Sequence, residues 1–316
     1  MDVAAGEVVH LVGDPLSGVA EAFEVLSGRR VAEAGRLQVA GQDVAGSGRR
    51  AREVWSRVAV LGDPQATSAG RRTVVEVLAD DVRRREPDPV RSVQPGHRER
   101  AVEALDDLGV PAEVRTRRER DVVGPERARV RLARLLLQQP AVVVLPPTQP
   151  PEQEDPASDL PGPELVESVL ARLRADSGSA IVRCNGQLPT ALGDHERVVV
   201  LCGGRIVEVL ASEGLAHPLH PWTRALAAGG EPLPARPDLA DPGCPFRPSC
   251  DRAQGRCATE MPELTRPLGA THPVACWFPQ PPPRQAAAGG PAAGAVLPPP
   301  ATGQGDEPTA QEFAEG

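Results

Sequence analysis

The sequence of 316 residues contains no lysine and no tyrosine, so all 35 of its basic residues are arginine. A chain without lysine cannot supply a Schiff-base lysine, a cofactor-binding lysine or the phosphate-binding lysine of a P-loop. Aromatic residues make up only 2% of the chain, so a core must be built from Val, Leu, Ala and Ile. The net charge of -8 argues against a general nucleic-acid binder or a membrane-surface binder.

Long apolar runs and export signals are also missing. The longest apolar runs, such as residues 141–145, are far shorter than the roughly 20 residues that span a bilayer. The N-terminus has neither a basic stretch nor a small-residue cleavage site, so we expect no signal peptide. We therefore expect an intracellular chain, soluble or peripheral to a membrane, whose six cysteines are free, metal-bound or catalytic.

Strand-like and helix-like patterns alternate along the first two thirds of the chain. The predicted strands are residues 7–13, 35–44, 56–64, 141–145 and 179–184, followed by a hairpin-like pair over 197–209. The predicted helices are residues 19–26, 98–108, 126–140 and 163–175, with an arginine-rich helix after residue 44. This alternation predicts an α/β fold with a parallel sheet.

Composition divides the chain into three predicted parts. Residues 1–215 carry the α/β pattern. Residues 216–280 are rich in Pro, Cys and His and have few apolar runs, so this extension needs a staple to hold a shape. Residues 281–316 are almost entirely Pro, Ala and Gly, and we expect them to be a disordered tail.

Four cysteines of the extension form a candidate metal site. Intervals of five, six and eighteen residues separate Cys244, Cys250, Cys257 and Cys276. Clustered thiolates in a segment with little core suit a soft metal, whose binding energy can fold the segment. The spacing does not match the CxxC knuckle of structural zinc and is compatible with a cubane cluster, but zinc and unligated thiols remain alternatives. Cys184 and Cys202 fall in predicted strands, and we expect them to be small core residues.

Several motifs resemble one protein family. The segments HPLHPWTRALAAG (217–229), GCPFRPSCDRAQGRC (243–257), MPEL (261–264) and THPVAC (271–276) resemble the C-terminal extension of ATP-binding subunits of oligopeptide and dipeptide ABC importers. Upstream, residues 7–13 resemble the strand before the Walker A loop, and residues 122–145 resemble the signature helix and the Walker B strand. The resemblance covers about residues 6–277.

The resemblance implies a P-loop NTPase-like ABC nucleotide-binding domain with a small Cys-containing C-terminal extension. Because the chain begins a few residues before the Walker A strand, the domain is expected to be N-terminally truncated, without the usual first strands and the adenine-stacking aromatic. In this family the extension holds a [4Fe-4S] cluster on four cysteines. The resemblance therefore implies that Cys244, Cys250, Cys257 and Cys276 are the cluster ligands.

The expected Walker A loop departs from the family pattern. Gly13 and Gly18 stand at the Gly-x4-Gly spacing, but Val19 and Ala20 occupy the positions of the phosphate-binding Lys and the Mg²⁺-binding hydroxyl. Pro15 also removes one amide that could contact phosphate. Taken alone, the glycine pair is more typical of a plain turn than of a phosphate-binding loop. Binding of ATP and Mg²⁺ is therefore doubtful.

The other nucleotide motifs are also degenerate. Gly62 replaces the Q-loop glutamine, and Gly186 replaces the switch histidine. Where the family has LSGGQ, this chain has Val122, Val123, Gly124, Pro125 and Glu126. The strand that should end in the Walker B Asp-Glu is followed by Pro146, Pro147 and Thr148, so both carboxylates are absent.

These observations favour a peptide-importer ATP-binding-subunit homologue that does not hydrolyse ATP and has a structural or regulatory role. The family implies two transmembrane permease subunits and a second ATP-binding subunit as partners, no nucleic acid, and a cytoplasmic location at the inner face of the membrane. Three alternatives are a functional ATPase that energises peptide uptake, a free-standing iron-sulfur regulator, and a decaying gene copy.

Overall fold

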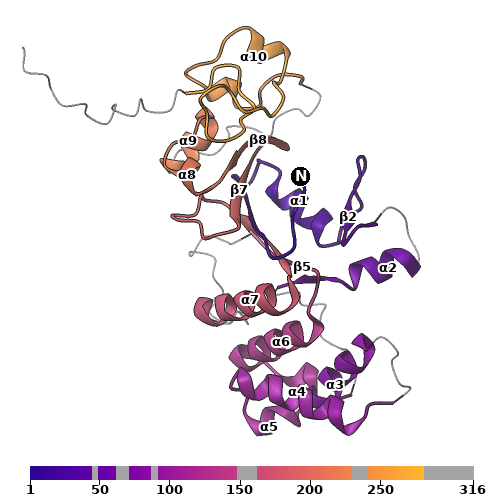
Figure 1. The fold of residues 1–316 in the computed structure, drawn as a ribbon. Helices are drawn as coiled ribbons and strands as arrows, with labels where there is room; N and C mark the ends of the chain where they lie inside the picture. The colour runs from indigo at the N-terminus through magenta and orange to yellow at the C-terminus, as the bar shows by residue number, and fades with distance from the viewer. Residues whose placement is uncertain (45–48, 62–70, 87–91, 148–161, 230–240, 281–316) are drawn as a thin grey trace, which may run out of the picture. The chain divides into compact units, whose positions relative to one another are not determined.

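A six-stranded sheet organises the chain in this computed structural model, which describes residues 1–44, 49–61, 71–86, 92–147, 162–229 and 241–280 (Figure 1). In spatial order its strands are β4 (Val58–Val60), β5 (Val142–Leu145), β6 (Ala180–Asn185), β1 (Val8–Val12), β7 (Glu196–Cys202) and β8 (Arg205–Leu210). The first five strands are parallel, and β8 pairs antiparallel with β7. The predicted α/β class and the predicted hairpin over 197–209 are confirmed.

The described residues form ten α-helices. They are α1 (Val19–Leu26), α2 (Arg49–Trp55), α3 (Val74–Arg85), α4 (Pro95–Asp107), α5 (Ala112–Arg115), α6 (Gly124–Gln138), α7 (Pro163–Ser177), α8 (Ser212–Leu215), α9 (Pro221–Ala227) and α10 (Arg256–Thr259). Among them, α1, α2, α4, α6 and α7 were predicted. Of these described helices, none is long and apolar enough to cross a bilayer. The predicted tail, residues 281–316, lies outside the described residues.

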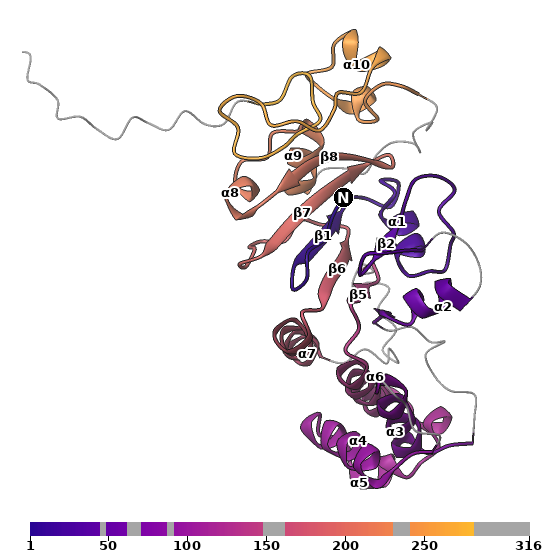
Figure 2. The same cartoon turned by 45° about the vertical axis from the view of Figure 1, so that its right-hand side comes forward.

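Strand β1 is buried along its whole length and lies between β6 and β7 (Figure 2). Its side chains alternate between the two faces of the sheet, as the strand period requires. Val9 and Leu11 pack with α1 on one face. On the other face Val8 packs with helices α6 and α7, and Val12 packs with Trp222 of α9. Apolar contacts therefore hold β1 from both faces.

One predicted strand is different in the structure. The segment over residues 35–44, predicted as a single extended element, forms a tight hairpin of β2 (Gln38–Val39) and β3 (Gln42–Asp43). The chain reverses at Ala40 and Gly41, which both have positive φ, at 48° and 73°. Two such residues in succession are typical of the two-residue turns that join hairpin strands. The Ala-Gly pair was the local signal for this turn.

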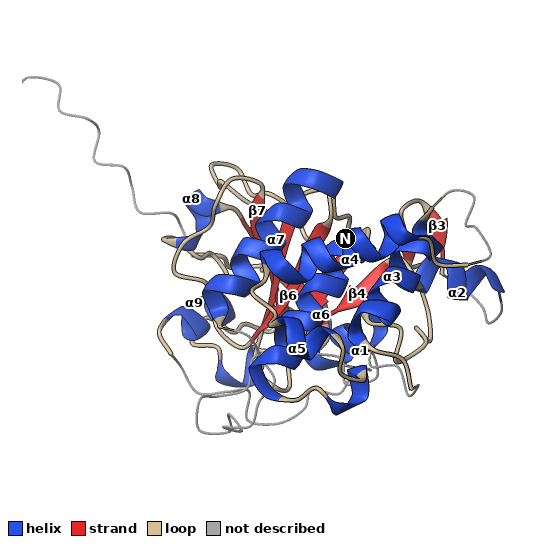
Figure 3. Ribbon diagram, turned by 90° about the horizontal axis from the view of Figure 1, so that it is seen from below, coloured by secondary structure: helices blue, strands red, loops and turns tan. Residues whose placement is uncertain are grey.

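Helices α3, α4 and α6 pack against one another, and α6 also contacts α7, which lies over β6 (Figures 1 and 3). The chain before α3 also contacts the chain before α6. Val74 N donates to the carbonyl of Arg117, and Glu119 N donates to the carbonyl of Arg72. The start of α3 and the segment that leads into α6 are therefore fixed together.

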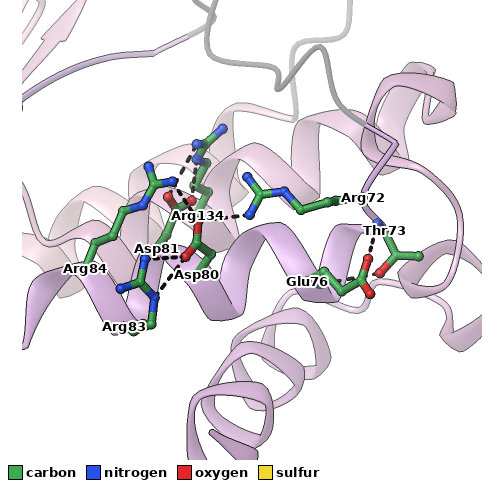
Figure 4. Close-up of polar contacts among 8 residues, drawn as sticks. All are labelled: Arg72, Thr73, Glu76, Asp80, Asp81, Arg83, Arg84 and Arg134. Atoms are coloured by element: carbon green, nitrogen blue, oxygen red, sulfur yellow. Dashed lines mark hydrogen bonds and ion pairs between the residues drawn. The ribbon is translucent and has the colours of Figure 1, made fainter. Parts of the chain in front are cut away.

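An ion-pair network strengthens this junction (Figure 4). Arg72 and Arg83 donate hydrogen bonds to the Asp80 carboxylate, at 2.9 and 2.7 Å, and Arg84 lies 2.7 Å from it. Next to it, Arg134 of α6 pairs with the buried Asp81 of α3 at 2.7 Å. Two consecutive carboxylates on α3 therefore bind arginines of the preceding segment, of α3 itself and of α6.

The arginines perturb the titration of Asp80. Burial acts to raise its pKa, but the hydrogen bonds from Arg72 and Arg83 and the charge of Arg84 outweigh burial and lower the pKa to about 2. A folded-state pKa below the unfolded value stabilises the protein at pH values above the unfolded pKa, here 3.8. This stabilisation is lost as the pH falls toward 2.

We expect Asp80→Asn to lower the free energy of unfolding at pH 7 by about 1 to 2 kcal/mol, because two of its three arginine partners are largely exposed and screened. The difference in free energy of unfolding between the two proteins should shrink as the pH falls from 4 toward 2, because the wild-type carboxylate becomes protonated and loses its charge. Urea unfolding at several pH values measures both effects. Asp176→Asn, on the exposed face of α7, is the control. Equal stability of Asp80→Asn and wild type at pH 7 would contradict the role of the network.

Candidate functional site

Three parallel strands end side by side at one edge of the sheet. Because β5, β6 and β1 are neighbours in the sheet, their carboxyl ends place Pro146, Gly186 and Gly13 along this edge. The amide of Gly13 donates to the carbonyl of Asn185, the last residue of β6, at 3.2 Å. Ligands of open α/β sheets bind at this edge. The structure thus brings together three of the predicted nucleotide positions.

The loop between β1 and α1 is closed by its own hydrogen bonds. The Asp14 side chain accepts from the amide of Leu16 at 3.0 Å, and its carbonyl accepts from the amide and the hydroxyl of Ser17 at 3.0 and 2.6 Å. Ser17 in turn accepts at its carbonyl from the amide of Gly204 at 2.6 Å. A phosphate-binding loop must leave such amides free to point at the ligand. Here two of them donate to Asp14.

Val19, at the position of the phosphate-binding Lys, is a core residue. It is the first residue of α1 and is 3% exposed. Its side chain belongs to the apolar cluster that also contains Val9, Phe23 and Val199. Ala20 is exposed and has no polar side-chain atom. The start of α1 therefore carries neither the cation nor the hydroxyl that a Mg²⁺-phosphate group requires.

The two loop glycines have a structural explanation. Gly18 has φ +97°, and a Cβ atom there would lie 2.9 Å from the Cα of Gly204 in the β7–β8 turn. A Cβ at Gly13 would lie 2.8 Å from the carbonyl oxygen of Leu201. Close approach to β7 and to the β7–β8 turn explains both glycines without a ligand.

The other described motif positions after β5 and β6 carry no polar side chain. Pro146 and Pro147 follow β5 directly, and Gly186 is exposed with open space around it. Gly124 and Glu126 lie in the first turn of α6, where a carboxylate is favourable beside the helix N-terminus. Gly62 and Thr148 lie outside the described residues.

These residues do not fit Mg²⁺-ATP. The described edge offers a buried carboxylate at Asp14, two prolines and a loop whose amides of Leu16 and Ser17 are engaged. Phosphate oxygens need cationic or amide donors, and Mg²⁺ needs oxygen ligands on the protein side. A pocket of about 450 Å³ lies beside α1, but its walls are mainly apolar side chains such as Leu11, Val25 and Ile206. No step of nucleotide chemistry follows from these groups.

The four cysteines of the extension, in contrast, line one common pocket. Cys244, Cys250, Cys257 and Cys276 all border it, together with His220 and Trp277. The amide of Cys244 donates to the carbonyl of Cys257 at 2.8 Å, so these two segments run side by side. Gly243 makes this approach possible, because a Cβ there would lie 2.5 Å from the carbonyl oxygen of Cys257. The structure therefore brings the predicted ligand residues together.

A buried carboxylate anchors the pocket to the sheet. Glu208 of β8 is fully buried and accepts from the amides of Leu219 and His220 at 2.6 and 3.2 Å. His272 Nε2 lies 2.6 Å from the same carboxylate. Just beyond it, the amide of Ala275 donates to β8 at Val207, so the segment that precedes Cys276 is added to the sheet edge. Glu208 thus fixes both segments that enter the pocket.

The donor set fits a thiolate-bound group, while the thiols are not yet arranged around one. Among the described residues, no three His, Cys, Asp or Glu side chains are placed to hold a metal ion. The pocket measures about 20 Å³, which is room for about one water molecule. Holding a cluster would require the four side chains to turn and the pocket to widen. Four soft donors on one pocket are nevertheless the chemistry that an iron-sulfur cluster needs.

Burial raises the pKa of Cys244 and Cys250, and it raises the pKa of Cys276 to about 11. These groups are therefore neutral thiols at pH 7 in the state described, and binding of a metal would release their protons. Cys184 and Cys202 are buried among the apolar residues of β6 and β7, which confirms their predicted core role.

Sequence analysis missed Asp14, Glu208 and the orientation of His220. The Asp14 contacts depend on the loop conformation, and Glu208 is buried by segments more than ten residues away in sequence. The sequence offered one weak signal, a single acidic residue inside the otherwise apolar run of 206–210. His220 directly precedes the Pro of α9, a position typical of a helix N-cap.

Comparisons with known proteins find relatives among transporter subunits. A family model described as "ABC transporter" matches residues 1–146. The "Probable peptide ABC transporter ATP-binding protein y4tS" of Sinorhizobium fredii is 30% identical over 291 residues, 87% of this chain and 79% of that protein. The "Di/tripeptide transport ATP-binding protein DppF" of Pseudomonas aeruginosa is 27% identical over 83% of this chain and 84% of that protein.

A solved structure supports the fold. The structure of cbiO1 from Clostridium perfringens, part of the ABC transporter complex cbiONQ, aligns with a TM-score of 0.50 at 17% identity. The alignment covers 69% of this chain and 82% of that chain. At this identity the likeness concerns the fold alone.

Proposed function

The chain belongs to the family of peptide ABC transporter ATP-binding proteins, and we propose that it is a peptide-importer subunit that does not hydrolyse ATP. In this proposal it contacts transmembrane permease subunits and a second ATP-binding subunit, and its role in the complex is structural or regulatory. The observation that carries the proposal is the β1–α1 loop, closed on Asp14 with Val19 in the core.

Several independent losses support the absence of hydrolysis. Val19 removes the charge that balances the phosphates, Ala20 removes the hydroxyl ligand of Mg²⁺, and Pro146 and Pro147 replace the Walker B carboxylates. Phosphoryl transfer depends almost entirely on positioning and electrostatic stabilisation. Removing one such stabilising contact commonly costs a factor of about 10² to 10³ in rate. Together, these substitutions remove the phosphate-binding charge, the hydroxyl ligand and the carboxylates on which the family chemistry depends.

A partner subunit with intact motifs does not repair these losses. In this family each composite site combines the Walker A loop of one subunit with the signature motif of the other. This chain would contribute Val19 and Ala20 to one site, and Gly124, Pro125 and Glu126 to the other. Glu126 would bring a negative charge toward the γ-phosphate. We therefore extend the proposal to both sites of a mixed pair.

We expect the purified full-length chain to release no phosphate from ATP above background. Val19→Lys alone should not restore turnover, because the carboxylates after β5 remain absent. Phosphate release in the presence of Mg²⁺ is the measurement, and Val31→Lys, at an exposed position, controls for the added charge. Since Val19 is buried, thermal melting must first show that the Val19→Lys variant folds. Turnover of the wild type at about 1 s⁻¹ or faster would overturn the proposal.

We also propose that the cysteine pocket binds a [4Fe-4S] cluster through Cys244, Cys250, Cys257 and Cys276. The support is the common pocket, its anchor at Glu208 and the family resemblance of the extension. A bound cluster would supply a one-electron redox centre and a covalent staple for the extension. The cysteines hold it as thiolates, and Glu208 keeps the two entering segments on the sheet.

The full-length protein, purified without oxygen, should contain about four iron and four sulfide per chain, the stoichiometry of a [4Fe-4S] site. Cys250→Ser or Cys257→Ser should abolish this content, since each removes one thiolate ligand. Cys184→Ser is the matched control, because Cys184 is buried in the sheet and should leave the iron content unchanged. Stoichiometric zinc without sulfide, or no metal at all, would contradict the cluster proposal.

A further inference from the structure

His220 is held in one orientation at the start of α9. It is the N-cap residue of this helix, and its Nδ1 accepts a hydrogen bond from the amide of Trp222 at 3.0 Å. The Trp222 side chain is buried and donates from Nε1 to the carbonyl of Leu201 at 2.9 Å. Because the backbone of α9 is fixed in this way, the Nδ1 edge of the His220 ring faces the helix.

This hydrogen bond determines which ring nitrogen carries the proton. A backbone amide can only donate, so Nδ1 must present its lone pair to Trp222. Burial lowers the pKa of His220 to about 4, although the charge of Glu208 acts in the opposite direction. The ring is therefore neutral at pH 7. A neutral imidazole with a lone pair on Nδ1 carries its hydrogen on Nε2.

Within the part of the chain that the structure describes, this Nε2–H has no hydrogen-bond partner. His220 is 1% exposed, so bulk solvent does not reach this group. A buried donor without an acceptor costs about 1 to 3 kcal/mol, and native proteins rarely keep one. The ring borders the pocket that Cys244, Cys250, Cys257 and Cys276 share. The acceptor it lacks is one that a group in this pocket would supply.

We propose that His220 Nε2–H donates a hydrogen bond to a sulfur of the iron-sulfur cluster held by the four cysteines. This inference rests on the cluster of the proposed function and deepens it. His220 is then a positioning residue that tunes the cluster and is not one of its ligands. Ligation through Nε2 would need the lone pair that the proton occupies, and ligation through Nδ1 would break the cap of α9.

A hydrogen bond to sulfur stabilises the more negative, reduced state of a cluster more than the oxidised state. His220 therefore raises the reduction potential of the site. The geometry also links the cluster to the fold. The imidazole ring of His220 caps α9, and the backbone amide of the same residue donates to Glu208. A change in cluster occupancy would act directly on this junction between the extension and β8.

Two substitutions separate the roles of the two ring nitrogens. The Asn oxygen in His220→Asn can replace Nδ1 as the helix cap, but the side chain places no donor at the Nε2 position. His220→Gln extends an amide N–H to about the Nε2 position and loses the cap. Redox titration of the full-length, cluster-loaded protein, followed by EPR, compares both variants with the wild type.

We expect His220→Asn to keep its iron and sulfide and to have a more negative midpoint potential. At the wild-type midpoint the ratio of reduced to oxidised cluster should fall about tenfold, which corresponds to about 59 mV for a one-electron couple. His220→Gln should recover most of this shift, although it melts at a lower temperature. In pulsed EPR, clusters assembled in D2O should lose one more exchangeable proton coupling in the wild type than in His220→Asn.

The outcomes distinguish this inference from the proposal on which it depends. If the wild type and His220→Asn both contain iron and sulfide and have equal potentials and equal proton couplings, the proposed hydrogen bond is overturned. The cluster proposal then still stands. A wild type without iron and sulfide would overturn the cluster, and the hydrogen bond with it. Loss of iron from His220→Asn, with iron retained in Cys184→Ser, would indicate that His220 is a ligand. This result would also overturn the inference.

Discussion

The position of β1 at the centre of the sheet is the constraint on which the rest of the structure depends. All five of its residues are buried, and it is hydrogen-bonded to β6 on one side and to β7 on the other. This pairing aligns the ends of three parallel strands and places the β1–α1 loop against the β7–β8 turn. In a fold of this kind the edge so formed is where nucleotide chemistry resides. Here the same scaffold carries Asp14, Val19, Pro146 and Gly186, and the loop is closed by internal hydrogen bonds.

Strand β8 supports a different kind of site. Strand β8 carries Glu208, whose buried carboxylate binds the two segments that lead into the cysteine pocket. A buried charge without partners would be very costly, so the carboxylate and its three donors are retained or lost together. Among the described residues, Val19, Pro146 and Gly186 bring no polar side chain to the nucleotide edge. Glu208 and its donors, in contrast, fix the two segments that lead to the cysteine pocket. This contrast supports the proposal that the role of the subunit is structural or regulatory.

Much of the fold could be predicted from residue patterns, because burial sets them directly. The apolar runs of β1 and of β5 to β7 and the helical spacing of α4, α6 and α7 gave the right elements in the right order. Short-range charge spacing could also have indicated that Arg83 and Arg84 bind Asp80. The pairing of Arg134 with Asp81, the burial of Glu208 and the tautomer of His220 join segments far apart in the chain. No local sequence pattern encodes such contacts. Gly62 and Thr148 lie outside the described residues.

We propose that the β1–α1 loop does not bind a nucleotide. Isothermal titration of the full-length chain with Mg²⁺ and a non-hydrolysable ATP analogue tests it most directly. Because the amides of Leu16 and Ser17 donate to Asp14 and Val19 lies in the core, we expect no saturable heat of binding up to about 1 mM ligand. A Kd of 1 mM corresponds to a binding free energy of about -4 kcal/mol. Saturable, Mg²⁺-dependent binding with a micromolar Kd would contradict it.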